Sequence, residues 1–258
     1  MNNKSMRKSR TGLSLVATCA FSIGLLAGSW PQLAISGGPY KRNDLHGARG
    51  TNAGGAVYDD GSVMMGANSR AQLTAQWWRW LYSIPIGVSP GGDTSGVDCP
   101  INQQGDVWFL AGPISGFEVT CTVPADKSIV SAVYAFLDDY PCPPGIYNDG
   151  SNGPGPGVRL EDFLLNDAAP YINGAMAAAQ LDGTPLKARR IMSRLFGFTA
   201  AADVNTIDAC VTGSPQLGVS DGYFVFIEPL SRGDHLLQLS WTSPGGSSAT
   251  GTVHLKIR

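Results

Sequence analysis

The chain has 258 residues, of which 43% are hydrophobic and 15% charged, and its formal net charge is −2. This composition supplies enough apolar material for a buried core and excludes a largely disordered protein. Glycine (33) and proline (17) are plentiful, which favours β-structure with long connections over a helical bundle.

Residues 1–29 have the parts of a secretory signal peptide, because four basic residues precede an apolar run from Leu13 to Ala27. The run is short for a membrane span, so we expect the signal to be removed, leaving no stable span; an uncleaved anchor is the alternative. Cleavage after Ser29 and cleavage after Ser36 both fit. The mature chain would be acidic, which argues against nucleic acid as a partner. We predict a secreted or periplasmic protein.

Residues 30–68 are rich in Gly, Asn, Asp and Arg, and we expect a flexible arm there, before a single domain of residues 69–258. Ser69 and Gln72 have the spacing of a capping box, which predicts a helix that ends before Pro85. Its stretch QWWRWLY places two tryptophans on an apolar stripe. Trp78 lies on the flank of this stripe, where it could contact a ligand or pack against a sheet.

Several segments after this helix have the pattern of strands. Residues 117–123 alternate apolar and polar side chains, which predicts a half-buried antiparallel strand. Residues 128–137 are nearly all apolar, which is typical of a central strand covered on both faces.

Asp138 and Asp139 follow this second strand and precede a Pro/Gly loop, YPCPPGIYNDGSNGPGPG, over residues 140–157. The two carboxyl groups could act as general acid and base, with Trp78, Tyr140 and Tyr147 stacking on sugar rings. Adjacent strand residues point to opposite faces, so capping of a turn is the alternative role of the two acids.

Metal sites have weak support in the sequence. Loops 93–98 and 148–153 are oxygen-rich and could hold calcium, but ordinary turns have the same composition. We therefore predict no metal site and no cofactor, and calcium is the cation that would fit best.

The last part of the chain predicts a second helix over residues 160–171 and three consecutive antiparallel strands, at 223–227, 235–241 and 252–257. His235 is expected at a strand end bonded to a turn, and His254 on the outward side of the last strand. Together these elements predict a mainly β fold with two helices, an antiparallel β-sandwich of immunoglobulin-like or jelly-roll-like type.

Four cysteines lie beyond the signal, and an even number in an exported chain predicts two disulfides. Three connectivities are open. We favour Cys99 with Cys121, which brackets a hairpin-like segment, and Cys142 with Cys210, which ties the long Pro/Gly loop to a distant one. None of them forms a CxxC pair, so a metal role is not expected.

Four stretches resemble a family of exported, uncharacterised bacterial proteins. They are the tryptophan-bearing helix ending in SIP, CPINQQGDVWFLAG (99–112), CTVPADK (121–127) and DGYFVFIEPLSRGDH (221–235). The resemblance implies one β-rich fold with the first two cysteines paired, and it brings no activity.

No nucleophile elbow, zinc-protease motif or phosphate loop is present in the sequence. We therefore expect an exported, disulfide-stabilised binding or interaction protein of the cell envelope or extracellular space, with a glycan or an envelope protein as its unknown ligand. The alternative is a secreted polysaccharide hydrolase or lyase that uses Asp138 and Asp139.

Overall fold

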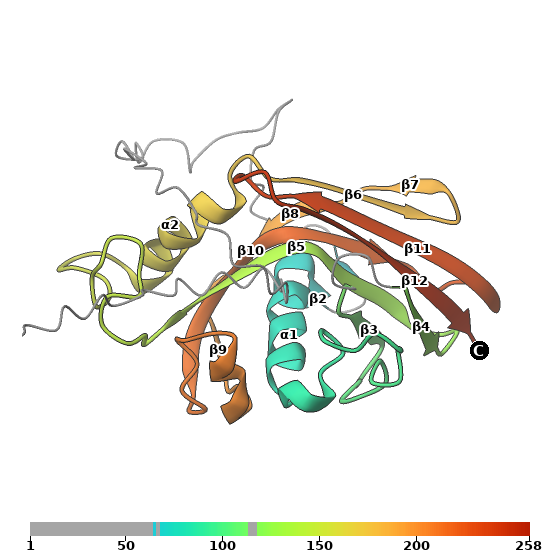
Figure 1. Cartoon of the computed structure of the whole chain (residues 1–258), viewed down its shortest axis with the longest axis horizontal. Helices are drawn as coiled ribbons and strands as arrows, with labels where there is room; N and C mark the ends of the chain where they lie inside the picture. Colours follow the sequence, from blue (N-terminus) through green and yellow to red (C-terminus); the bar gives the residue numbers. More distant parts are fainter. Residues whose placement is uncertain (1–63, 66–67, 113–117) are drawn as a thin grey trace, which may run out of the picture.

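The computed structural model describes residues 64–65, 68–112 and 118–258 and has a mainly β fold with two helices (Figure 1). The predicted signal peptide and nearly all of the predicted arm lie outside these residues. The helices are α1 (Arg70–Tyr82) and α2 (Leu160–Ile172), with short helical turns η2 (Ile86–Val88) and η3 (Ala202–Thr206) and a small pair of strands, β1 (Met64–Met65) and β2 (Asn68–Ser69).

Two five-stranded sheets make up the body of the fold. The first sheet has the order β3 (Val107–Leu110), β5 (Ser128–Tyr140), β10 (Gln216–Ile227) and β8 (Arg189–Met192), and β9 (Phe196–Phe198) also pairs with β10. The second sheet has the order β4 (Glu118–Val123), β12 (Ser248–Ile257), β11 (Gly233–Thr242), β6 (Met176–Leu181) and β7 (Thr184–Leu186).

The prediction of a wholly antiparallel sandwich is wrong in two pairings. Strand β3 runs parallel to β5, and β4 runs parallel to β12, so both sheets are mixed. Each parallel strand lies at the end of its sheet, and the other pairings of the two sheets are antiparallel. The immunoglobulin-like or jelly-roll-like topology stays a prediction.

The three C-terminal strands do not form one meander, contrary to the prediction. Strand β10 belongs to the first sheet, whereas β11 and β12 pair with each other in the second. Residues 228–232 connect the first sheet to the second. The alternating pattern within each strand does not indicate to which sheet that strand belongs.

Helix α1 begins with the predicted capping box. The Ser69 hydroxyl accepts a bond from the Gln72 amide at 3.3 Å, and Gln72 Oε1 accepts one from the Ser69 amide at 2.8 Å. The helix ends at Tyr82, before Pro85, as the sequence predicts. It lies under the first sheet (Figure 1), where Phe109, Val130 and Phe224 belong to the same apolar cluster as the helix.

All three tryptophans of α1 are buried, and each indole N–H has an acceptor. Trp77 donates to Leu110 O at 2.8 Å, Trp80 to Ile101 O at 2.9 Å, and Trp78 to Ser220 Oγ at 2.9 Å. A buried indole keeps its place when its one polar atom is satisfied. The row therefore forms the core beneath the first sheet.

The first sheet is covered on both faces by different elements. Helix α1 covers one face, and on the other face the second sheet lies over one end of β5 and β10 while α2 lies over the other end (Figure 1). This agrees with the prediction of a central strand over residues 128–137 that is buried on both sides.

A β-bulge divides strand β5 into two halves. Its pairing with β10 shifts register between Tyr223 and Phe224, which pair with Tyr134 and Ala132 respectively. Val130 and Ala132 pack on the α1 side before the shift, and Leu137 does so after it, so the extra residue changes which side chains face α1. The bulge thereby sends Asp139 to the α1 side and Asp138 to the α2 side.

We predict that Gly222→Ala lowers the free energy of unfolding by about 1–3 kcal/mol, as overpacking does elsewhere. A Cβ at residue 222 would lie 2.5 Å from the Ala135 Cα, which is the backbone of the paired strand and cannot move aside cheaply. Urea denaturation followed by tryptophan fluorescence measures the change. Gly155→Ala is the control, because a Cβ at that exposed glycine meets nothing within 4 Å; equal stability of the two variants would contradict the prediction.

Candidate functional site

Two of the three predicted sugar-stacking side chains are buried. Trp78 has 3% of its surface exposed and Tyr147 also 3%, so neither offers a ring face to a ligand. The Tyr147 hydroxyl donates to Asp139 O at 2.8 Å, and its ring meets the Phe163 ring edge-on. Tyr140 is half-buried beside Gly153. The expectation of an aromatic platform made by these three residues is therefore wrong.

Asp138 and Asp139 lie within β5, with 6% and 2% of their surface exposed. They are not turn caps, because the strand continues to Tyr140. As the alternation of a strand predicts, they point to opposite faces, and each meets a different carboxyl group there. The two acids therefore cannot act together on one substrate as general acid and base.

Asp138 faces Asp167 of α2 beneath the long Pro/Gly loop. Asp167 Oδ1 accepts a bond from the Asn148 amide at 2.8 Å, and the Asn148 side chain donates to Asp167 O at 2.8 Å and accepts from the Tyr171 hydroxyl. Among the described residues, the buried Asp138 Oδ2 has no hydrogen-bond partner. Burial raises the pKa of Asp138 to about 9, and the nearby Asp167 and Asp139 carboxyls add to this rise.

Asp139 faces the α1 side and the segment that leads to Cys210. Gln216 Nε2 donates to Asp139 Oδ2 at 3.1 Å. The neighbouring Asp208 accepts bonds from the Tyr82 hydroxyl at 2.9 Å and from the Cys210 amide at 3.0 Å. Burial raises the pKa of Asp139 to about 8, and the Asp208 carboxyl contributes to the rise.

The structure pairs Cys99 with Cys121 and Cys142 with Cys210, which are the two favoured disulfides. The second one lies against Asp139 and joins the base of the Pro/Gly loop to the segment after η3. Gln216 reinforces this junction, because its Nε2 also donates to Pro141 O at 3.1 Å and to Cys210 O at 2.9 Å.

Asp167, Asp208 and Gln216 are the members of this cluster that sequence reasoning missed. Asp208 stands two residues before Cys210, so the favoured disulfide could have drawn attention to it. Asp167 and Gln216 carry no local signal, because one lies on an ordinary helix and the other begins a strand.

The described residues give little support to a metal site. One Asp139 oxygen lies within 4.8 Å of the Cys142 and Cys210 sulfurs, but those sulfurs are bonded to each other. The two oxygen-rich loops form ordinary turns: Asp93 accepts bonds from the Ser95 and Asp98 amides, and Asp149 accepts one from the Ser151 amide.

The two histidines of the C-terminal strands occupy their predicted positions. His235 lies at the start of β11, where its ring contacts Ser231 O at 3.0 Å and Asp182 Oδ2 at 2.7 Å. His254 is exposed on β12 and lies 3.3 Å from Glu118 Oε2. His46 lies outside the described residues.

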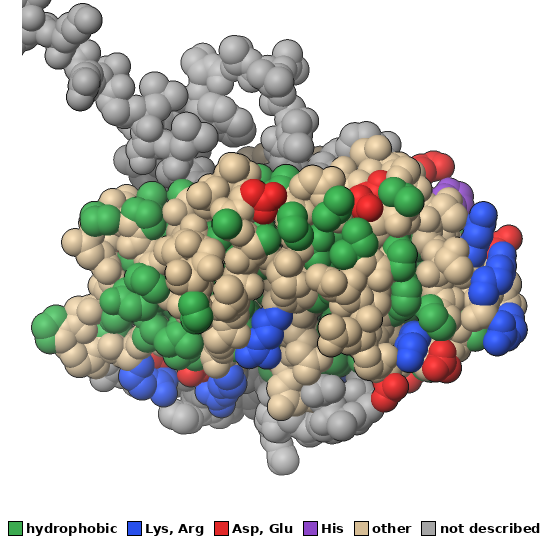
Figure 2. All heavy atoms as spheres, turned by 90° about the horizontal axis from the view of Figure 1, so that it is seen from below, with side chains coloured by type: hydrophobic (Ala, Val, Ile, Leu, Met, Phe, Trp, Pro, Cys, Tyr) green, Lys and Arg blue, Asp and Glu red, His purple; other side chains and the backbone are tan. Residues whose placement is uncertain are grey.

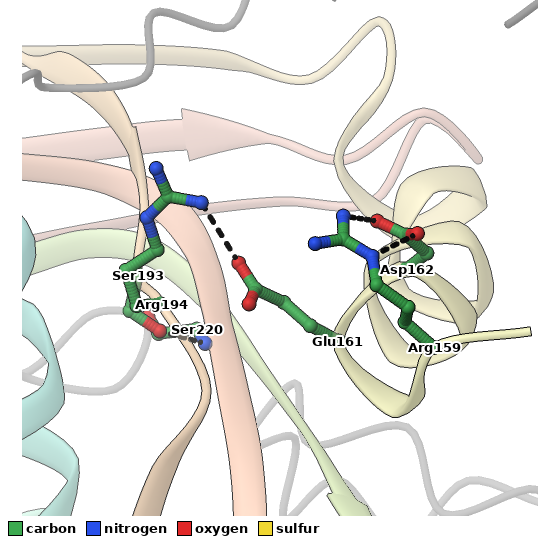
Figure 3. A network of polar contacts seen from close by, with 6 residues as sticks. All are labelled: Arg159, Glu161, Asp162, Ser193, Arg194 and Ser220. Carbon is green, nitrogen blue, oxygen red and sulfur yellow. Dashed lines mark hydrogen bonds and ion pairs between the residues drawn. The ribbon is translucent and has the colours of Figure 1, made fainter.

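Polar contacts surround the first turn of α2, and one of them reaches it from the first sheet (Figure 3). Arg194, which follows β8, lies 3.3 Å from Glu161, and Arg159 pairs with Asp162 at 2.7 Å. Beside Arg194, Ser193 Oγ accepts a bond from the Ser220 amide at 2.8 Å. Exposed ion pairs contribute little energy, so apolar burial of Leu164 and Ala168 does most of the anchoring that keeps Asp138 covered.

A small cavity in the described part of the chain lies apart from the buried acids. A cavity lined by Trp80, Asp93 and Val119, among others, has a volume of about 10 Å³, roughly the room that one water needs. None of the four clustered acids lines it. Seen from the side of α1, charged side chains are sparse except toward one end of the molecule (Figure 2).

Comparison with known proteins gives no family. No family model and no curated protein matches this chain. A solved structure described as "Structure of PbICP-C in complex with falcipain-2" aligns at 8% identity and a TM-score of 0.22, covering 60% of this chain and all of that one. So low a TM-score does not establish a shared fold. In the described part of the chain, neither helix has the length and apolar character for crossing a membrane.

We predict that Asp138→Asn stabilises the protein at pH 8 and leaves stability nearly unchanged at pH 4. The pKa of Asp138 is raised on folding, so wild-type stability is full below the unfolded pKa near 4 and falls as pH rises toward 9. The asparagine amide is always neutral and can donate to Asp167. The gain should grow by about 1 kcal/mol per pH unit between these limits.

Urea denaturation at several pH values measures this gain. Asp106→Asn is the control, because that side chain is fully exposed and such a change alters stability little. A gain that does not vary with pH would show that Asp138 is not the buried, proton-binding group described above.

Proposed function

We propose that this chain is an exported, disulfide-stabilised binding protein of the cell envelope or extracellular space, and that its ligand is a glycan. Two disulfides support an oxidising compartment outside the cytosol. The inaccessibility of the acids in β5 supports binding over hydrolysis. We also propose that the protein is bacterial and that its topology is immunoglobulin-like or jelly-roll-like, with the parallel strands β3 and β4 added at the edges of the two sheets.

The observation that carries the proposal is an exposed row of polar side chains across the outer face of the second sheet. Register places Glu118, Thr252, Gln238 and Gln180 side by side on β4, β12, β11 and β6. Three of them are exposed and Thr252 is half-buried. At about 4.8 Å between strands, they form a strip of evenly spaced hydrogen-bonding groups.

The chemistry of this strip suits sugar hydroxyl groups. Amide and hydroxyl side chains both donate and accept hydrogen bonds, as sugars require, and only one of the four side chains is charged. In the next row of the sheet, Thr250 and Ser240 add two hydroxyl groups beside Ala178. An open polar strip that crosses four strands fits an extended polymer better than a small molecule, which needs a concave pocket.

We predict that replacing Gln180 and Gln238 together by methionine weakens glycan binding about thirtyfold. The change keeps the side-chain size and removes two hydrogen-bonding amides, each worth about 1 kcal/mol. Binding is measured on a glycan array and then by co-sedimentation with purified peptidoglycan. Gln104→Met, at an exposed position in the turn before β3, is the matched control and should bind like the wild type.

Two results would overturn the proposal. One is release of new reducing ends from a bound polysaccharide, which would make the protein a hydrolase. The other is binding that the double substitution leaves unchanged, which would place the ligand elsewhere on the protein.

A further inference from the structure

The two disulfides lie in different surroundings. Cys99 and Cys121 are both buried, with 7% and 1% of their surface exposed, in the core between the two sheets. Cys142 is partly exposed at the base of the Pro/Gly loop, and its partner Cys210 is buried. Cys142 is therefore the least buried of the four paired cysteines, and access to one sulfur is the first requirement for exchange.

A carboxyl group lies directly against this second disulfide. One Asp139 oxygen and the two sulfurs lie within 4.8 Å of one another, and Cys142 Sγ is 3.8 Å from Asp139 Oδ1. The Gln216 amide holds the other oxygen, Oδ2, at 3.1 Å, which leaves Oδ1 directed toward the sulfurs. A side chain that can give and take a proton thus lies within 4.8 Å of both sulfur atoms that would react.

We propose that the Cys142–Cys210 disulfide undergoes thiol–disulfide exchange with a dithiol partner, and that Asp139 donates the proton to the departing sulfur. This activity goes beyond the proposed glycan binding and does not depend on it.

The exchange balances in two steps. A thiolate of the partner attacks Cys142 Sγ, the Cys142–Cys210 bond breaks, and its electron pair passes to Cys210 Sγ, which takes the Asp139 proton. The partner's second thiol then returns a proton to Asp139, attacks the mixed disulfide and expels the Cys142 thiolate, which is protonated from solvent. The partner loses two electrons and two protons and becomes a disulfide, and the protein gains both as two thiols.

The charges around Asp139 fit the role of proton donor. Its pKa is raised by burial and by Asp208, so the carboxyl is protonated at neutral pH and has a proton to give. Asp208 also accepts a bond from the Cys210 amide, so a thiolate on Cys210 would form beside a second acid and needs prompt protonation. The Tyr82 hydroxyl bonds Asp208, and Asp138 lies across the strand on the opposite face.

The test compares the two disulfides within one molecule. The folded full chain is treated with excess dithiothreitol between pH 6 and 9, quenched at intervals with N-ethylmaleimide, and digested, and mass spectrometry then counts alkylated cysteines at each pair. Circular dichroism checks that the protein stays folded. Asp139→Asn removes the proposed proton donor, and Asp138→Asn removes the neighbouring buried acid on the opposite face as a matched control.

We expect Cys142–Cys210 to be reduced at least tenfold faster than Cys99–Cys121. In Asp139→Asn its reduction should slow severalfold, with Cys99–Cys121 unaffected, whereas Asp138→Asn should react like the wild type. The wild-type rate, corrected for the thiolate content of dithiothreitol, should fall above pH 8, and that fall should vanish in Asp139→Asn. Reduction of both pairs at the rate of global unfolding, or a corrected wild-type rate without a fall above pH 8, would overturn the proposal; the latter measurement needs no variant to fold.

Discussion

The bulge in strand β5 is the constraint on which the rest of the molecule depends. A strand of thirteen residues that is covered on both faces must present apolar side chains to two cores. The extra residue opposite Tyr223 and Phe224 reverses the alternation, so that a different set of side chains faces α1 beyond the bulge. Asp138 and Asp139, near the end of the strand, therefore face opposite sides and are buried by different segments. Asp138 lies under α2 and the Pro/Gly loop, and Asp139 lies above the segment that carries Cys210. Because the strand itself separates the two carboxyls, each has its own partners and its own chemistry.

Both acids stay in the interior because they can hold a proton there. Burying an ionised carboxylate is far more costly than burying a neutral, hydrogen-bonded acid, so the pKa values of Asp138 and Asp139 rise when the surrounding segments bury them. The segments over both acids make polar contacts there. On the α2 side the Asn148 amide donates to Asp167, and on the α1 side Gln216 donates to Asp139. The Gln216–Asp139 contact is buried, and a buried hydrogen bond favours one arrangement of the segments it joins, which helps to fix the base of a long loop rich in proline and glycine.

The sequence predicted what depends on neighbouring residues, and it missed what depends on distant ones. The capping box at Ser69 and the stop at Pro85 place α1 correctly, and the favoured disulfides follow from counting cysteines and weighing the segments between them. The sequence does not decide whether Trp78 contacts a ligand or the core, because a helical projection gives an angle but not what covers that flank, which is β10 through Ser220. The parallel pairings of β3 and β4, and the meeting of Asp167 with Asp138, depend on tertiary packing that no local pattern encodes.

The exposed face of the second sheet and the covered end of β5 are separate parts of the molecule, and this separation bears on both proposals. The polar row on β4, β12, β11 and β6 belongs to a sheet whose own disulfide, Cys99–Cys121, is buried beside β4. Opening Cys142–Cys210 would leave Gln216 as the link between Pro141 and Cys210, and it would loosen the Pro/Gly loop while the second sheet kept its register. Glycan binding and disulfide exchange can therefore be measured independently, because the groups that carry them share no residue and no strand.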